Sequence, residues 1–97
     1  MTEPREKLTL PELAAKKAAG DRLVMVAVGE VLTATWAERA GVDIIGVGDS
    51  LGMTLHGHDN TLSMTVDQMI MHTQAVRRGA PNTLCLVSMP YGSYATS

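Results

Sequence analysis

Three short apolar runs, separated by segments of helical periodicity, constrain the fold of this chain more than any other feature. The runs cover residues 23–28, 44–47 and 83–87 and are dominated by Val, Ile and Leu. Continuous apolar runs of this length predict strands buried in a sheet. Because a helical segment lies between successive runs, the chain must return by crossovers. This predicts a parallel sheet with right-handed connections.

Start and stop signals bracket the first two predicted helices. Thr9 and Glu12 have the spacing of a capping box, and they precede an alanine-rich segment that ends at Gly20. A second helix is predicted over residues 32–40, where Gly41 follows as a typical C′ residue. The chain therefore begins with a helix that precedes the first predicted strand.

A third helix is predicted between the second and third apolar runs. Thr65 and Gln68 form another capping box, and Gly79 is expected to end the helix. One face carries apolar or weakly polar side chains at helical spacing. They are Val66, Met69, Ile70, Thr73 and Val76. The helix is thus predicted to pack this face against the sheet.

The segment from residue 48 to residue 64 has no clear period and is predicted to be a long loop. Loops of this length in compact domains are usually functional. It opens with Gly48, which permits a sharp turn, and then places Asp49 and Ser50 directly after the second apolar run. In parallel α/β proteins the chemistry collects at the carboxyl ends of strands. The alternative is that Asp49 merely caps a turn.

Length, charge and cysteine content narrow the classes of protein. A chain of 97 residues permits one small domain, and a net charge of −2 gives no electrostatic footprint for nucleic acid or anionic membranes. Cys85 is the single cysteine, so no disulfide can form within the chain, as in a reducing compartment. The first residues are polar and charged, unlike a signal peptide. We expect a cytoplasmic protein without a membrane span, whose residues 1–8 are disordered.

Several motifs occur together in the second half of the chain. Val-Gly-Asp-Ser-Leu-Gly-Met at residues 47–53 is followed by Gly-His-Asp-Asn-Thr-Leu at 57–62 and by Arg-Arg-Gly-Ala-Pro at 77–81. Shorter matches include His72-Thr73, Pro90 and Tyr94-Ala95-Thr96. In combination the series resembles the ketopantoate hydroxymethyltransferase family, enzymes of pantothenate and coenzyme A synthesis. The resemblance runs from about residue 23 to the last residue.

The resemblance implies a fold where periodicity leaves two possibilities. A helix followed by β-α-β-α-β fits either a flavodoxin-like piece or the opening of a (β/α)8 barrel. The family is a (β/α)8 TIM barrel with an extra N-terminal helix, and a complete barrel needs about 250 residues. We therefore expect residues 1–97 to be a single α/β segment, the front third of a barrel. Such an incomplete barrel should associate with the rest of the barrel or form a homo-oligomer.

The resemblance also implies a reaction and the roles of two residues. The family transfers a hydroxymethyl group from 5,10-methylenetetrahydrofolate to 3-methyl-2-oxobutanoate, a small 2-oxo acid, with Mg²⁺ assisting the enolate chemistry. Mg²⁺ prefers oxygen ligands. By resemblance, Asp49 serves the metal and lies beside the substrate, and Ser50 contacts the substrate carboxylate. The chain is then part of a longer one-carbon transferase and is expected to be inactive alone.

Two positions depart from the family pattern. The family usually has Tyr-Asp after the first strand, where this chain has Gly29 and Glu30, and Asp-Leu-Pro after the third, where Ser88 opens Ser-Met-Pro. A serine brings no charge and is a weaker Mg²⁺ anchor, but its place at a strand end predicts that Ser88 binds substrate, directly or through water. The family's lysine, second metal carboxylate and glutamate base are expected beyond Ser97. The general base is therefore not assigned.

Other interpretations remain open at this stage. His56 and His58 form a His-x-His pair that could hold Zn²⁺, although shaping of the loop by hydrogen bonds is the simpler interpretation. His72 lies on a predicted helix and is expected to be packed or half-exposed. At the level of function, the departures at Gly29 and Ser88 allow a relative that acts on another 2-oxo acid, or a non-catalytic barrel module.

Overall fold

The computed structural model describes residues 8–90, 92 and 93. Its elements are α1 (Leu10–Ala18), β1 (Met25–Ala27), α2 (Val31–Ala40), β2 (Ile44–Val47), α3 (Leu51–Thr54), α4 (Val66–Gly79) and β3 (Leu84–Val87). The predicted order of a helix followed by β-α-β-α-β is confirmed, with one additional short helix. Residues 1–7 of the predicted disordered lead-in and the Tyr94-Ala95-Thr96 match lie outside the described residues, and Leu8 is half-buried.

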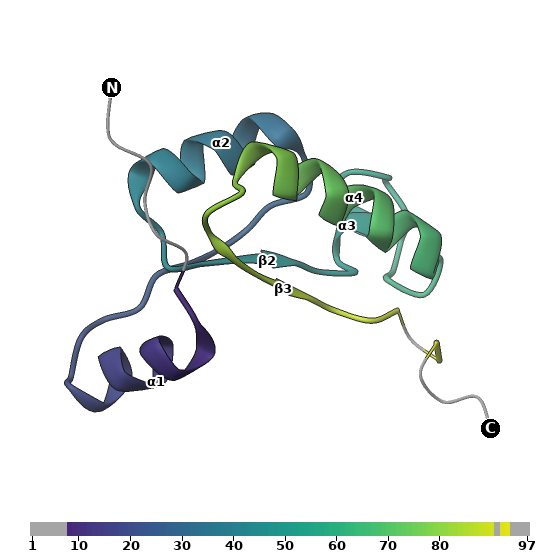
Figure 1. Ribbon diagram of the computed structural model, residues 1–97. Coiled ribbons are helices and arrows are strands. Elements are labelled where there is room, and N and C mark those ends of the chain that lie inside the picture. Colours follow the sequence, from purple (N-terminus) through teal and green to yellow (C-terminus); the bar gives the residue numbers. More distant parts are fainter. Residues whose placement is uncertain (1–7, 91, 94–97) are drawn as a thin grey trace.

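The three strands form one parallel sheet in the order β1-β2-β3. Ile44 of β2 pairs with Met25 of β1 on one side and with Leu84 of β3 on the other. Figure 1 shows α2 and α4 lying over the same face of this sheet. A flavodoxin-like sheet would place its first strand between the second and third and would carry helices on both faces. A sequential order with helices on one face is instead consistent with part of a TIM barrel.

The hydrophobic core lies between this face of the sheet and the two long helices. Ile45 and Val47 of β2 are 0% exposed, as is Ala34 of α2. From α4, Met69 and Val76 complete the same cluster. Side chains of a strand alternate between faces, so the core receives every second residue of β2.

The opposite face of the sheet is open. Met25 of β1 is 58% exposed and Leu86 of β3 is 44% exposed, so the prediction that these strands are buried on both faces is wrong for this chain. The reason is that both covering helices lie on the other side (Figure 1). A hollow of about 270 Å³ lies over the open face and reaches Gly48 and Ser88 at the carboxyl ends of the strands.

Helix α4 differs from its prediction in two respects. The capping box of Thr65 and Gln68 is present as expected, but Val66 and Ile70 remain exposed although they share the predicted apolar face. Gly79 does not end the helix in a left-handed conformation; it is the last helical residue and packs against α2. Val66 and Ile70 instead line an apolar groove beside the end of β3.

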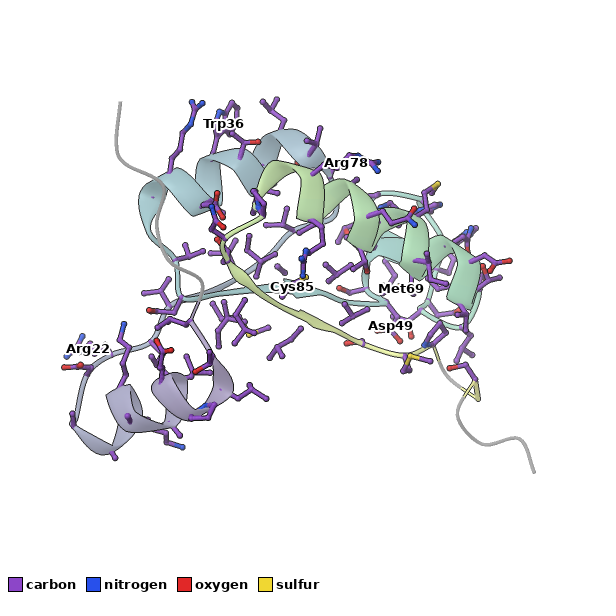
Figure 2. The ribbon with its side chains drawn as sticks, in the orientation of Figure 1. Arg22, Trp36, Asp49, Met69, Arg78 and Cys85 are labelled. Carbon is purple, nitrogen blue, oxygen red and sulfur yellow. The ribbon has the colours of Figure 1, made fainter. Side chains whose placement is uncertain are left out.

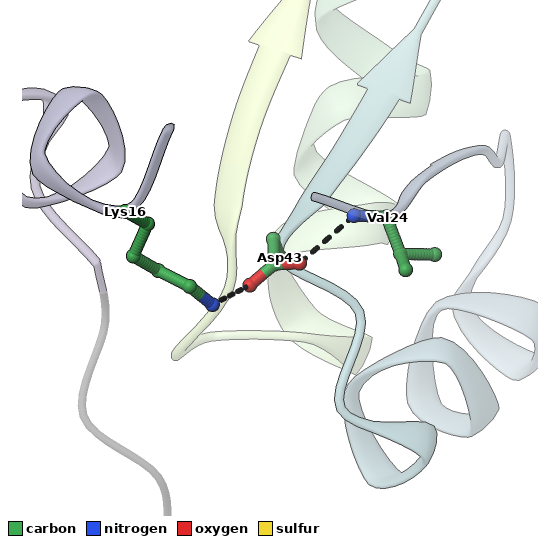
Figure 3. A network of polar contacts seen from close by, with 3 residues as sticks. All are labelled: Lys16, Val24 and Asp43. Atoms are coloured by element: carbon green, nitrogen blue, oxygen red, sulfur yellow. Dashed lines mark hydrogen bonds and ion pairs between the residues drawn. The ribbon is translucent and has the colours of Figure 1, made fainter. Parts of the chain in front are cut away.

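Helix α1 is attached to the sheet by polar contacts. It has no buried residue, and its N-cap is Thr9, whose hydroxyl accepts a hydrogen bond from the N–H of Glu12 as predicted. The Lys16 ammonium lies 2.7 Å from a carboxylate oxygen of Asp43, whose other oxygen accepts a hydrogen bond from the N–H of Val24 (Figure 3). Asp43 is buried and immediately precedes β2. It therefore joins α1 to the amino end of the sheet.

In the part of the chain that the structure describes, no helix is both long enough and apolar enough to span a bilayer.

Candidate active site

Asp49 lies in the turn that leads from β2 into α3. The N–H of Leu51 donates to the carbonyl of Gly48, and the N–H of Gly52 donates to the carbonyl of Asp49, so the chain turns directly into helix. The predicted structureless loop from residue 48 to residue 64 therefore contains a short helix, which sequence periodicity could not reveal in four residues. Figure 2 shows Asp49 at the end of the sheet that lies away from α1.

The side chain of Asp49 has no part in holding this turn together. It is half-buried, and among the described residues its carboxylate has no hydrogen-bond donor and no ion-pair partner. A turn-capping aspartate would accept a hydrogen bond from a nearby backbone N–H. The turn is closed by backbone hydrogen bonds instead, which leaves the carboxylate available to a ligand.

Two hydroxyl groups lie next to the same turn. A Cβ atom placed on Gly48 would lie 3.5 Å from the Oγ atom of Ser50 and 3.9 Å from the Oγ atom of Ser88. Ser88 reaches this position because its N–H donates to the carbonyl of Val47 and extends the pairing of β3 with β2. Both serines are exposed. The fold thus brings Ser50 and Ser88 together at one corner beside Gly48, and Asp49 lies between Gly48 and Ser50 in the chain.

This group of oxygen donors suits a hard cation. One carboxylate and two hydroxyls match the preference of Mg²⁺ for oxygen, and Mg²⁺ sites often contain only one or two protein carboxylates. Within the described residues there is no group of three or more His, Cys, Asp or Glu side chains that could hold a metal ion. Asp49 is therefore the residue beside this corner that could supply a charged oxygen ligand.

The end of β1 shows why a glycine stands at residue 29. A Cβ atom there would lie 2.6 Å from a δ-carbon of Leu51 and 2.8 Å from one of Leu55. Gly29 is buried under these two leucines of α3 and its flanking turn. A larger side chain at residue 29 would require the side chains of Leu51 and Leu55 to shift. The departure at Gly29 is thus linked to the packing of the helix that follows Asp49.

Glu30 has a structural role that sequence reasoning missed. It is the N-cap of α2, and its carboxylate accepts hydrogen bonds from the N–H groups of Leu32, at 2.7 Å, and Thr33, at 3.0 Å. A hydrogen bond from the Thr33 side chain lowers the pKa of Glu30 most; desolvation raises it, and the backbone bonds lower it further, for a net lowering. The available signal was a carboxylate immediately before a helical segment.

Histidines from two segments meet near this end of β1. The Nε2 atoms of His56 and His72 are 2.8 Å apart, and the Nδ1 atom of His72 lies 2.7 Å from the carbonyl oxygen of Gly29. The ring of His58 stacks beside that of His56 with centroids 6.0 Å apart. His56 therefore contacts His72 of α4, a pairing that sequence spacing did not predict. His72 is half-buried, as predicted.

Comparison with known proteins connects this arrangement to a family. A family model described as ketopantoate hydroxymethyltransferase matches residues 7–97. The chain belongs to the ketopantoate hydroxymethyltransferase family. It is 51% identical over 92 residues to 3-methyl-2-oxobutanoate hydroxymethyltransferase 1 of Methylibium petroleiphilum, a match that covers 95% of this chain and 31% of that protein.

Two further members of the ketopantoate hydroxymethyltransferase family give the same result. A 3-methyl-2-oxobutanoate hydroxymethyltransferase of Geobacillus kaustophilus is 56% identical over 81 residues, covering 84% of this chain and 29% of the relative. A 3-methyl-2-oxobutanoate hydroxymethyltransferase of Thermosynechococcus vestitus is 47% identical over 93 residues, covering 96% of this chain and 36% of the relative. The chain thus spans about a third of the length of these curated relatives.

Proposed function

We propose that this chain forms the front third of a ketopantoate hydroxymethyltransferase and contributes Asp49, Ser50 and Ser88 to the binding of a 2-oxo acid. The observation that carries this proposal is the unpartnered carboxylate of Asp49 at the carboxyl end of β2. It is supported by the two serine hydroxyls at the same corner and by the open sheet face beneath them.

The proposed reaction joins 3-methyl-2-oxobutanoate to the one-carbon unit of 5,10-methylenetetrahydrofolate. The C3–H bond of the 2-oxo acid and the two bonds from the methylene carbon to the folate nitrogens break, and a bond forms from C3 to that carbon. Water supplies the oxygen of the new hydroxyl group, and the folate nitrogens take up protons, so the products are ketopantoate and tetrahydrofolate. A bound Mg²⁺ ion would supply Lewis-acid polarisation of the 2-oxo group. The task of this chain is to hold and orient the oxo acid.

Each of the three side chains has a distinct proposed role. Asp49 supplies a negatively charged oxygen ligand for Mg²⁺, directly or through one water. The hydroxyl of Ser50 donates a hydrogen bond to the substrate carboxylate. Ser88 faces the same corner from β3 and is proposed to bind substrate, directly or through water. Because the Ser88 hydroxyl carries no charge, Mg²⁺ should bind more weakly here than in relatives that have an aspartate at this position.

The experiment is calorimetric titration of the full-length protein with Mg²⁺ and 3-methyl-2-oxobutanoate. Asp49→Asn preserves the shape of the side chain and removes its charge, so we expect it to abolish metal-dependent binding of the oxo acid. Ser88→Asp adds a carboxylate at the same corner and should tighten Mg²⁺. Asp67→Asn is the matched control, because Asp67 is an exposed carboxylate in the first turn of α4.

The outcomes separate the functional role of Asp49 from a structural one. Loss of binding in Asp49→Asn, with the circular dichroism spectrum of the parent and normal binding in Asp67→Asn, supports the proposal. Unchanged metal-dependent binding in Asp49→Asn would refute the assignment. Transfer of the one-carbon unit from 5,10-methylenetetrahydrofolate is measured on the same samples to establish the activity.

A second candidate function is favoured by the absence of a carboxylate at Ser88. A diverged relative could act on another 2-oxo acid, and a non-catalytic barrel module would need no metal. Titration of the full-length protein with a panel of 2-oxo acids distinguishes them. Tighter binding of a different member indicates the diverged enzyme, whereas no binding of any member in the presence of Mg²⁺ indicates the module.

The partners of the chain are also part of this proposal. The open sheet face and the groove lined by Ile70, Val87 and Met89 leave apolar surface uncovered. We propose that the remaining β/α units of a barrel cover these surfaces and that the whole protein is a cytoplasmic homo-oligomer. Sedimentation of residues 1–97 alone tests the first point, because the uncovered surface should make the segment self-associate, whereas a monodisperse monomer would contradict it.

A further inference from the structure

Helix α3 directly follows Asp49 and Ser50, and it is too short to be stable by itself. It has four residues, whereas isolated helices shorter than about 12 residues are marginal in water. Its hydrogen bonds reach back into the turn before it, because the carbonyl of Ser50 accepts from the N–H groups of Met53 and Thr54. Contacts that hold α3 in place therefore also hold the turn that carries Asp49.

The segment that follows α3 is hydrogen-bonded to the same helix. The N–H of His56 donates to the carbonyl of Leu51, and the N–H of His58 donates to the carbonyl of Gly52 at 2.8 Å. Gly57 lies between the two histidines with a φ of +76°, which glycine adopts without strain. Since these bonds fold the segment back on α3, a contact made by the His56 side chain acts on the helix.

His72 of α4 connects this segment to the end of β1. Its Nδ1 atom lies 2.7 Å from the carbonyl oxygen of Gly29, and a carbonyl can only accept, so Nδ1 carries the hydrogen. In the neutral ring Nε2 is then an acceptor, and the Nε2 atom of His56 lies 2.8 Å from it. The ring centroids are 5.1 Å apart, which places both nitrogens on the line between the rings. This is the geometry of a hydrogen bond from His56 to His72.

The histidine bridge, formed by His56, His72 and the carbonyl of Gly29, supplements an apolar contact at the same place. Leu51 is buried, and its δ-carbons lie with one of Leu55 over Gly29. Apolar contacts are non-directional, whereas a hydrogen bond is strong only within narrow limits of distance and angle. The leucines therefore attach α3 to the end of β1, and the bridge fixes where along that contact the helix lies.

We propose that His72 is a positioning residue, which acts through His56 to fix α3 and thereby the turn of Asp49 and Ser50. The inference rests on the proposed function, because it assigns to His72 the orientation of groups that bind the 2-oxo acid. Such groups must be held closely, since a misplacement of about 1 Å can lower a rate roughly a hundredfold. Neither imidazole has to touch the substrate for this role.

Hydrogen–deuterium exchange of the full-length protein tests the bridge without a measurement of activity. His56→Ala removes the donor, and the fold should survive because His56 is exposed. We expect the backbone amides of residues 51–58 to exchange roughly two- to tenfold faster in this variant, the range that one hydrogen bond contributes. His58→Ala is the matched control, because it removes an exposed imidazole that stacks on His56 and is not part of the bridge. It should leave the exchange unchanged.

Steady-state kinetics of the one-carbon transfer show whether the bridge serves substrate binding. In His56→Ala the KM for 3-methyl-2-oxobutanoate should rise roughly two- to tenfold, with the KM for 5,10-methylenetetrahydrofolate unchanged. A general loss of stability would move neither KM. His56→Gln should restore the parent KM, because a glutamine amide can donate to His72 but cannot act as an acid or base. The double variant with His72→Ala should have the same KM as His72→Ala alone, since the two rings act as one unit.

The outcomes distinguish failure of this inference from failure of the proposed function. Exchange that is unchanged in His56→Ala, or accelerated equally in His58→Ala, would overturn the role of the bridge. A raised KM that His56→Gln does not restore would also overturn it, because His56 would then act on the substrate itself. If the parent protein binds no 2-oxo acid, the proposed function fails and the role of His72 in substrate binding fails with it. The exchange measurement then still decides whether the bridge holds α3.

Discussion

Replacement of Gly79 by alanine sets two physical effects against each other. Gly79 is the last residue of α4 and does not have a positive φ, so helix propensity alone favours alanine, by up to about 0.5–1 kcal/mol. The tertiary structure opposes the change. A Cβ atom there would overlap the backbone carbonyl oxygen of Val31 and lie 3.0 Å from the Cβ of Ala34 and 3.1 Å from the Oγ1 of Thr35.

The steric effect should exceed the gain in propensity. Ala34 is fully buried, and the carbonyl of Val31 also accepts a hydrogen bond from the Thr35 hydroxyl, so neither neighbour can move without loss. Overpacking of this kind costs about 1–3 kcal/mol. Subtracting the propensity term leaves a net destabilisation of about 0–2.5 kcal/mol, centred near about 1 kcal/mol, which is roughly a five-fold change in the ratio of folded to unfolded protein.

Urea denaturation followed by circular dichroism measures this difference. Arg78 is exposed in the same turn, so Arg78→Ala compared with Arg78→Gly gives the propensity term without the steric one. We expect alanine to be more stable than glycine at residue 78 and less stable at residue 79. If Gly79→Ala raised the free energy of unfolding, the close approach of α4 to α2 described above would be wrong.

Four further variants test contacts elsewhere in the fold. Thr65→Ala removes the N-cap of α4 and should lower the free energy of unfolding by about 1 kcal/mol, measured by urea denaturation. Asp43→Ala should lower the free energy of unfolding by about 2–4 kcal/mol, because it leaves the N–H of Val24 without its acceptor. Lys16→Met should lower it by less than about 1 kcal/mol, since Lys16 is partly exposed. Equal effects of the two variants in thermal melts would contradict this difference. Because the pKa of Glu30 is lowered on folding, its carboxylate stabilises the protein above the ordinary glutamate pKa, and this stabilisation is lost as the pH falls through the lowered value. Glu30→Gln should therefore be less stable than the parent near pH 7 and indistinguishable from it in strong acid, and a constant difference across that range would count against the cap.

Local signals in the sequence were sufficient for most of the secondary structure. The caps at Thr9 and Thr65 and the left-handed residue Gly41 depend on contacts within a few residues, so composition and spacing identify them. The same holds for the strands, because apolar runs interrupted by helices leave a parallel sheet as the simplest arrangement. The motif around Asp49 was recognisable for a similar reason, since its residues are contiguous in the chain.

Only the tertiary structure decided which side chains meet across the chain. Ser88 lies with Ser50 beside Gly48 because β3 ends next to β2. His72, in the middle of α4, meets His56 of the segment that follows α3. Gly79 gave the signal of a helix end, yet its missing side chain serves the contact with α2. The exposure of Met25 could not be read from its run either, because burial depends on which face the helices cover and an apolar run is the same on both faces.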